Sequence, residues 1–261
     1  MLKRIIIPII LILMMASSLS GQNDQDRQTI FPRGIAIDYG LGSYSVRDEY
    51  ISKEKYSGAL PYFTASWSRF QEKGGYCLGL EFRSSDEIKN FNINTQIIQF
   101  ALYRDYLYRV GKFSLFSKHV YAFLGPTPEF YFYYNQPNIS RNGLYLNLSF
   151  AALLSLGCNG QFIMPLRQDL QAEGSYRMSL LSVGLRMVEL VDRDVGTDKP
   201  PLKFLTPFSG LNATLNLGLR YYLLRSFSLK LAYKVQILRI TPWDELISAS
   251  DNLTASVSYH F

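Results

Sequence analysis

The chain has few of the residues that metal and redox sites use. Its 261 residues include two cysteines and two histidines. Cys77 and Cys158 fall on separate, non-neighbouring predicted strands, and their spacing to the histidines matches no zinc pattern. We therefore expect two free thiols, no metal and no cofactor.

Long apolar runs are also scarce, and the one that stands out lies at the amino terminus. Lys3 and Arg4 precede an apolar run at 5–16, which small polar residues follow. This layout is typical of a secretory signal peptide. A transmembrane helix is the alternative, but the run is shorter than the roughly 20 residues that a span needs. We expect residues 1–21 to be a signal peptide and residues 22–33 a periplasmic N-terminal segment.

Charge of one sign is not concentrated anywhere. The chain has 27 basic and 21 acidic residues, a formal net charge of +6, and the basic residues are dispersed. Nucleic-acid binding needs a basic patch or stripe. We therefore expect no nucleic-acid partner.

Alternation of apolar and polar residues is abundant, and it is clearest at the carboxyl end. From Leu253 to Phe261 every odd position is apolar and every even position is polar. Side chains on a strand point to opposite faces with a period of two, so this segment predicts a strand with one apolar and one polar face. Aromatic residues are frequent too, with 19 Tyr and 17 Phe, and Tyr favours membrane interfaces.

The same alternation predicts about ten strands between residues 34 and 261. Their approximate ranges are 34–44, 58–69, 76–83, 92–108, 113–134, 144–157, 170–180, 211–222, 227–237 and 253–261. Polar stretches at 47–55 and 84–90 are interpreted as loops, and 110–112 as a turn. The phase change at Ile97 and Ile98 is interpreted as a bulge. Pro126 and Pro128 predict a bulge or a distorted rim, because proline cannot donate to a sheet ladder.

These strands can cross a membrane only as a closed barrel, because lipid leaves no partner for unpaired backbone groups. A soluble sandwich or lipocalin-like barrel is the alternative, since a period of two does not say which face looks outward. Strand lengths near the roughly 9 to 11 residues of a membrane strand, and connections that alternate between short and long, favour the membrane. We predict an all-β, transmembrane, antiparallel up-and-down β-barrel of about ten strands, with eight as the alternative, over residues 34–261.

Several segments resemble known barrels. The ending with Tyr259 and Phe261 resembles the terminal strand that the barrel assembly machinery of outer membranes reads. Tyr121–Tyr134, with Leu124-Gly125-Pro126 inside it, and the pair Leu156–Gly160 and Leu170–Tyr176 resemble small outer-membrane barrels of the PorT-like family. The resemblance implies an integral protein of a Gram-negative outer membrane, with lipid and the assembly machinery as partners. It carries over no catalytic residue, and members of the family serve secretion, assembly, adhesion or unknown roles.

If the apolar faces look outward, acids and bases in equal numbers point into the barrel. They include Glu81, Arg83, Glu129, Glu173, Arg177, Arg220, Lys230 and Lys234, with Asp38 and Asp105. Buried charges need partners, so an internal network that fills the barrel is one interpretation. A narrow polar pore or a small ligand site is the other. His119 and His260 belong to no catalytic motif, so we expect no enzymatic activity.

The longest predicted connection runs from Glu189 to Pro207. It offers charges beside an apolar anchor, namely Asp192, Arg193, Asp194, Phe204 and Leu205, and the loop with Trp243 belongs to the same end. Long loops on a rigid scaffold commonly bind partners, although a solvated loop without a partner is the alternative. The expected function is a non-enzymatic structural or interaction subunit of an outer-membrane secretion or assembly complex. The alternative is a small porin-like channel or ligand-binding barrel.

Overall fold

The computed structural model describes residues 33–49, 51–90, 93–138, 140–141, 144–145, 147–190, 202–224 and 226–261. The predicted signal peptide and residues 22–32 lie outside these ranges. Within them, no helix is long and apolar enough to cross a membrane. The strands are β1 (Arg33–Asp48), β2 (Ser52–Ala59), β3 (Tyr62–Gln71), β4 (Gly74–Asn90), β5 (Ile93–Leu115), β6 (Lys118–Pro137), β7 (Ser140–Arg141), β8 (Leu144–Tyr145), β9 (Asn147–Pro165), β10 (Leu170–Leu190), β11 (Leu202–Leu205), β12 (Gly210–Leu224), β13 (Phe227–Ile240) and β14 (Leu246–His260).

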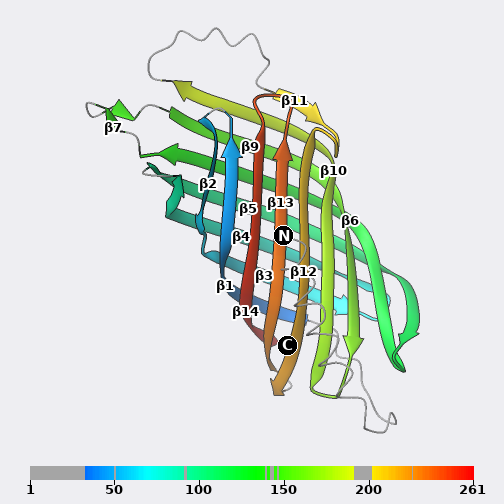
Figure 1. Cartoon of the computed structure of the whole chain (residues 1–261). Helices are drawn as coiled ribbons and strands as arrows, with labels where there is room; N and C mark the ends of the chain where they lie inside the picture. Colours follow the sequence, from blue (N-terminus) through cyan, green and yellow to red (C-terminus); the bar gives the residue numbers. More distant parts are fainter. Residues whose placement is uncertain are drawn as a thin grey trace.

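The strands form a closed antiparallel ring (Figure 1). Its order is β1, β3, β4, β5, β6, β9, β10, β12, β13 and β14, and the pairing of β14 with β1 closes it. β2 and β3 occupy one strand position beside β1, with a break at Leu60-Pro61 between them. The short β11 pairs with β10. The prediction of an antiparallel β-barrel with ten strand positions is therefore confirmed, and the alternative of eight is wrong.

The two ends of the barrel differ. At one end, called here the turn end, tight connections at 72–73, 116–117, 166–169 and 225–226 join consecutive strands. The first residue of β1 and the last residues of β14 lie at the same end, because Gly34 pairs with His260. The opposite end, called the loop end, has the longer connections 138–146 and 191–201.

One predicted turn lies in the wrong place. Residues 110–112 do not turn. β5 continues to Leu115, and the chain reverses at Phe116 and Ser117, which both adopt positive φ angles of 49° and 61°. The ladder between β5 and β6 shifts register between Arg109 and Gly111. The glycine that suggested a turn therefore lies at a bulge inside a longer hairpin.

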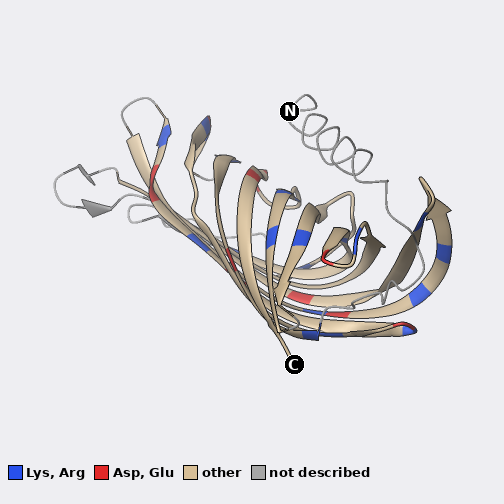
Figure 2. Ribbon diagram, turned by 90° about the horizontal axis from the view of Figure 1, so that it is seen from below, with Lys and Arg blue, Asp and Glu red and all other residues tan. Residues whose placement is uncertain are grey.

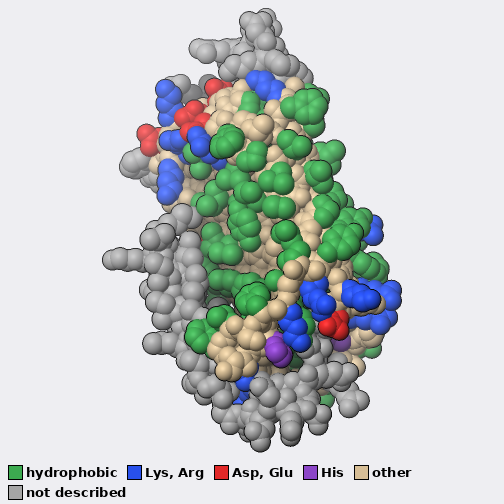
Figure 3. Space-filling view, turned by 90° about the vertical axis from the view of Figure 1, so that its right-hand side faces the viewer, with side chains coloured by type: hydrophobic (Ala, Val, Ile, Leu, Met, Phe, Trp, Pro, Cys, Tyr) green, Lys and Arg blue, Asp and Glu red, His purple; other side chains and the backbone are tan. Residues whose placement is uncertain are grey.

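The outer surface is apolar over most of the barrel wall. Ile35, Ile37, Tyr39 and Leu41 of β1 are each more than half exposed. Figure 3 shows hydrophobic side chains across the middle of one face, with charged side chains gathered toward its two ends. The residues between them on β1 point inward and are small or polar. Over this stretch, the predicted arrangement of apolar residues outside and polar residues inside is what the structure has.

Toward the loop end the two faces exchange their character. On β1 the outward residues become Ser43, Ser45 and Arg47, while Tyr44 and Val46 point inward and are buried. β2 and β4 follow the same inverted pattern, with Tyr56 and Ile88 inside and lysines or acids outside. The barrel wall therefore changes from an apolar outside to a polar outside along single strands.

This inversion corrects three predictions. Most of the stretch 47–55 and all of 84–90 are strand, because antiparallel partners continue the ladder there, as Val46 with Tyr56 does. The phase change at 97–98 is no bulge on β5. Burial alternates along β5 without a break across these residues, and Ile97 is fully buried in the loop-end interior. The register shift in this pair of strands lies on β4, between Ser85 and Ile88.

The prediction for the two prolines is confirmed only in part, because the ladder is interrupted beside them but within the wall rather than at its rim. β6 pairs with β9 continuously through Pro126 and Pro128, but its ladder with β5 is interrupted between the pairs Tyr103–Glu129 and Tyr108–Leu124. Proline lacks the N–H that this side of the ladder would need. The interruption lies beside the charged interior described next.

Candidate functional site: the interior of the barrel

Most of the predicted interior charges are buried inside the ring. Figure 2 shows charged residues carried on the strands themselves. Glu81, Arg83, Glu129, Glu173, Arg220 and Lys234 are buried, and Arg177 and Lys230 are nearly so. The structure brings these eight residues together in two neighbouring groups, one around Arg177 and one around Glu173.

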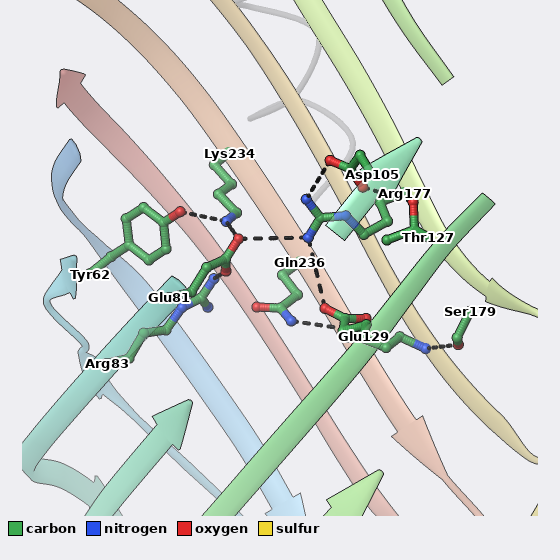
Figure 4. A network of polar contacts seen from close by, with 11 residues as sticks. Tyr62, Glu81, Arg83, Asp105, Thr127, Glu129, Arg177, Ser179, Lys234 and Gln236 are labelled. Atoms are coloured by element: carbon green, nitrogen blue, oxygen red, sulfur yellow. Dashed lines mark hydrogen bonds and ion pairs between the residues drawn. The ribbon is translucent and has the colours of Figure 1, made fainter. Parts of the chain in front are cut away.

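Arg177 on β10 is the centre of the first group (Figure 4). Its guanidinium lies 3.4 Å from a carboxylate oxygen of Asp105 and 3.8 Å from one each of Glu81 and Glu129. These acids come from β4, β5 and β6, on the other side of β9. Because one planar cation faces three acids from three strands, it fixes how β10 sits against them.

A tyrosine supports this arginine from below. The Arg177 guanidinium lies 3.4 Å from the centre of the Tyr103 ring, a cation–π distance. The ring occupies the space above Gly79, where an added Cβ would come within 2.2 Å of it. The absence of a side chain at Gly79 thus leaves room for the Tyr103 ring beside the charge of Arg177.

Lys234 on β13 joins the same group from the side of the ring that faces β4. Its Nζ donates to Glu81 Oε1 and to the Tyr62 hydroxyl, both at 2.6 Å. Arg83 lies 3.8 Å from the other oxygen of Glu81 and donates to Ser250 on β14 at 2.7 Å. Glu81 therefore links β4 to both β10 and β13 across the interior.

Glu173 is the centre of the second group, nearer the turn end. Arg220 donates to both of its carboxylate oxygens, at 2.6 and 3.1 Å, and Lys230 Nζ lies 3.0 Å away. Arg220 also donates to the hydroxyls of Ser228 and Ser258. Because Arg220 bonds to both oxygens of the buried Glu173 and Lys230 pairs with the same carboxylate, the group forms a rigid cross-link between β10, β12 and β13.

The remaining free space in this region is small. A polar cavity of about 130 Å³ runs from the Arg177 group toward Gly34 and His260 at the turn end. Among the described residues, no three His, Cys, Asp or Glu side chains are placed to hold a metal ion. Cys77 lines the cavity and Cys158 lies on the outward face, so both thiols are free.

The loop-end interior has a different composition, which the sequence analysis missed. It is an apolar core whose larger members include Tyr44, Tyr56, Ile97, Tyr133, Leu205, Leu238, Ile240, Trp243 and Leu246. An ion pair lies inside this part of the barrel. Arg186 on β10 donates to Asp48 on β1 and to the backbone carbonyl of Asp244, and both charged side chains are fully buried. In the sequence, this ion pair could have been recognised from an acid, Asp48, and a base, Arg186, at inward positions of strands whose apolar and polar faces exchange.

The predicted partner loop is only partly described. Asp192, Arg193 and Asp194 lie outside the described residues. Phe204 on β11 is 86% exposed, whereas Leu205 and Trp243 are buried in the loop-end core. The expectation that these two residues form a surface anchor is corrected: alternation along β11 turns Leu205 inward, and Trp243 packs beneath it.

The two histidines lie at the turn end, as predicted. His119 is exposed on β6. His260 Nε2 lies 2.8 Å from the Ser228 hydroxyl, but Ser228 is fully buried and also accepts from Arg220. A nucleophilic serine needs access to substrate and an oriented base. No carboxylate bonds to Nδ1 of His260 among the described residues.

Comparisons with known proteins add the following. No family model matches the chain, and no curated protein matches it. Among solved structures it is similar to the outer membrane protease OmpT from Escherichia coli, at 9% identity and a TM-score of 0.49, over 90% of this chain and 99% of that one. It is also similar to the translocator domain of the autotransporter NalP from Neisseria meningitidis, at 11% identity and a TM-score of 0.46, over 95% and 93%. At these values the likeness concerns the fold alone.

Proposed function

We propose that this chain is a non-enzymatic, integral β-barrel protein of a Gram-negative outer membrane, and that it acts as a structural or interaction subunit of a secretion or assembly complex. The filled interior carries this proposal. A charged layer around Arg177 and Glu173 and an apolar core around Trp243 occupy the space that a pore would need. A barrel without a pore acts through its surfaces.

The membrane location rests on the outer surface of the barrel. Residues such as Leu154, Leu231 and Val257 are more than half exposed on the barrel wall, and water-facing surfaces seldom carry such a continuous apolar band. Tight turns belong to the periplasmic side of such barrels and longer loops to the cell exterior. The turn end then faces the periplasm. The inverted, polar-walled loop end stands in water outside the membrane.

The role in a secretion or assembly complex rests on fewer observations than the membrane location. The PorT-like resemblance of Tyr121–Tyr134 and the terminal aromatics Tyr259 and Phe261 favours a role beside secretion or assembly machinery, including the barrel assembly machinery as an early partner. The exposed Phe204 and Phe208, at 86% and 90%, offer an apolar contact for a protein partner at the loop end. A photo-crosslinking residue at Phe204, compared with one at Leu124 in the apolar band, would capture such a partner in native membranes.

The alternative function is a small channel or ligand-binding barrel. The polar cavity of about 130 Å³ favours it, because cavities of this size hold water or a small polar molecule. Single-channel recording in planar bilayers separates the two functions. We expect no conductance steps from the purified barrel. The variant Tyr133→Ala/Trp243→Ala, which thins the loop-end core, serves as the matched control that admits water. Steady open steps from the unmodified protein would reject the closed interior.

A further inference from the structure

A group of arginines and aromatics faces outward at the turn end of β1, β3, β4 and β5. It consists of Arg33, Trp67, Arg69, Tyr76, Arg104 and Tyr106, and we call it the basic aromatic surface. The three arginines are exposed, and Trp67 is 39% exposed. These residues are separate from the interior charges, because they stand on the apolar outer face of the wall.

Strand register places the six residues in two adjacent rows. In the row nearer the turn end, Arg33 pairs with Arg69, Arg69 with Tyr76, and Tyr76 with Tyr106. In the next row, Ile35 pairs with Trp67, Trp67 with Leu78, and Leu78 with Arg104. Neighbouring strands are about 4.8 Å apart, so each row is continuous across the wall.

The aromatic rings hold one of these arginines in place. The Arg104 guanidinium lies 4.7 Å from the centre of the Tyr106 ring and 5.8 Å from that of Tyr76. Trp67 packs edge-on against Tyr76 with ring centres 5.1 Å apart. Tyr76 therefore lies at the centre of the surface, between Arg69 on one side and Arg104 on the other.

The three arginines have no acidic partner within the described part of the chain. The exposed ion pairs at this end are Arg109 with Glu72 and Arg167 with Asp169, and no carboxylate lies within 4.0 Å of Arg33, Arg69 or Arg104. Like charges directly opposite each other on neighbouring strands, as Arg33 and Arg69 are, destabilise a sheet. An anion from outside the chain would remove this repulsion.

We propose, resting on the membrane location and orientation proposed above, that the basic aromatic surface binds the phosphate headgroup of an anionic phospholipid in the periplasmic leaflet. Arginine donates in a planar fork that matches phosphate oxygens, and tyrosine and tryptophan favour the headgroup level of a bilayer. The adjoining row supplies the second half of the site. Ile35, Trp67 and Leu78 are 51%, 39% and 40% exposed beside the arginines, which suits acyl chains and gives free phosphate nothing to contact.

Trp67 provides a direct test. The chain has two tryptophans, and Trp243 is buried in the loop-end core, so Trp243→Phe leaves Trp67 as the single reporter. This variant is reconstituted in phosphatidylcholine vesicles with increasing brominated phosphatidylglycerol or, in parallel, brominated phosphatidylcholine. We expect Trp67 to be quenched at much lower fractions of the anionic lipid.

Variants at the arginines complete the test. Each basic residue near an anionic surface contributes about 1 kcal/mol, or about fivefold, so Arg33→Gln/Arg69→Gln/Arg104→Gln should weaken the lipid preference about 100-fold. The triple lysine variant should keep most of it, and Arg167→Gln, at the same end, should keep all of it. Folding of every variant is checked by heat-modifiable migration on a gel. If the triple glutamine variant does not fold, Arg104→Gln alone should still lose about fivefold.

Two results would overturn the proposal. One is equal quenching of Trp67 by the anionic and the zwitterionic brominated lipid in the parent protein, or an unchanged preference in the folded glutamine variants. The other is displacement of the anionic lipid by inorganic phosphate at millimolar concentration. A site for the free ion would not depend on the acyl chains.

Discussion

Arg186 on β10 and Asp48 on β1 form an ion pair across the loop-end interior, although five other strand positions separate their strands on one side and three on the other. Both side chains are fully buried, and Asn135 on β6 donates to the second oxygen of Asp48 at 3.4 Å. The pair therefore ties distant parts of the ring to one another, beside the apolar loop-end core.

Removing one partner of this pair should strongly destabilise the barrel. Asp48→Asn removes the carboxylate charge to which the buried Arg186 donates, which costs about 3–5 kcal/mol. Urea unfolding in detergent micelles, followed by the fluorescence of Trp243, measures the loss. Arg239→Gln is the control, because its ion pair with Glu245 is half exposed and should contribute less than about 1 kcal/mol. A loss no larger than that of the control would contradict the cross-link.

The Arg177 group should behave as one unit. Arg177→Gln leaves Glu81, Asp105 and Glu129 close together without their shared cation, so we expect a loss of about 3–5 kcal/mol in the free energy of unfolding. Arg177→Lys should recover part of it, since a lysine keeps the charge but not the planar fork. In a double-mutant cycle with Glu129→Gln, the coupling energy should exceed about 1 kcal/mol. Simple additivity of the two substitutions would mean that the group is not coupled.

Substitutions on either side of the inversion should locate the edge of the membrane. Ile37→Arg introduces a charge into the apolar band and should cost about 2–4 kcal/mol in lipid. Ser57→Arg, outward on β2 beyond the inversion, should cost less than about 0.5 kcal/mol because that surface already faces water. Folding stability in vesicles gives both values. Equal costs would mean that both positions face the same medium.

The terminal aromatic residues should matter for assembly more than for stability. Tyr259 lies between Phe227 and Phe261 on the outward face, with ring centres 5.2 and 6.4 Å away, and Phe261 is 57% exposed. Phe261→Ala therefore removes little packing, and refolding of the purified protein in micelles should change little. The heat-modifiable fraction in native outer membranes should fall. Leu253→Ala, on the same face of β14, is the control, and an equal effect of both would count against an assembly signal.

The ring could be predicted from sequence wherever apolar residues face outward. β12 and β13 alternate cleanly, so their starts and faces were predicted closely, whereas β14 begins at Leu246, well before the predicted start at Leu253. The polar stretches at the loop end were misread because the same alternation continues there with its two faces exchanged, and lysines on a strand such as β2 look like loop residues.

The interior could be predicted in part. Inward positions follow directly from alternation, which identified Glu81, Arg177 and Arg220. Alternation does not say which strands face each other across a barrel, so the pairing of Arg177 with three separate acids could not be derived. The burial of Leu205 and Trp243 was missed for a related reason: they cover a core that exists only because the faces invert.

In the orientation proposed above, the inversion on β1, β2 and β4 also affects what the cell exterior meets. An antibody or phage that approaches this protein encounters a rigid, polar strand wall around Lys55 and Lys89, in addition to the longer loops. Such an epitope has a fixed shape, and its residues are tied to an apolar core beneath them, so variation there is constrained by folding. Escape from recognition would then fall to outward side chains such as Ser57 and Lys89, which can change without disturbing Tyr56 or Ile88.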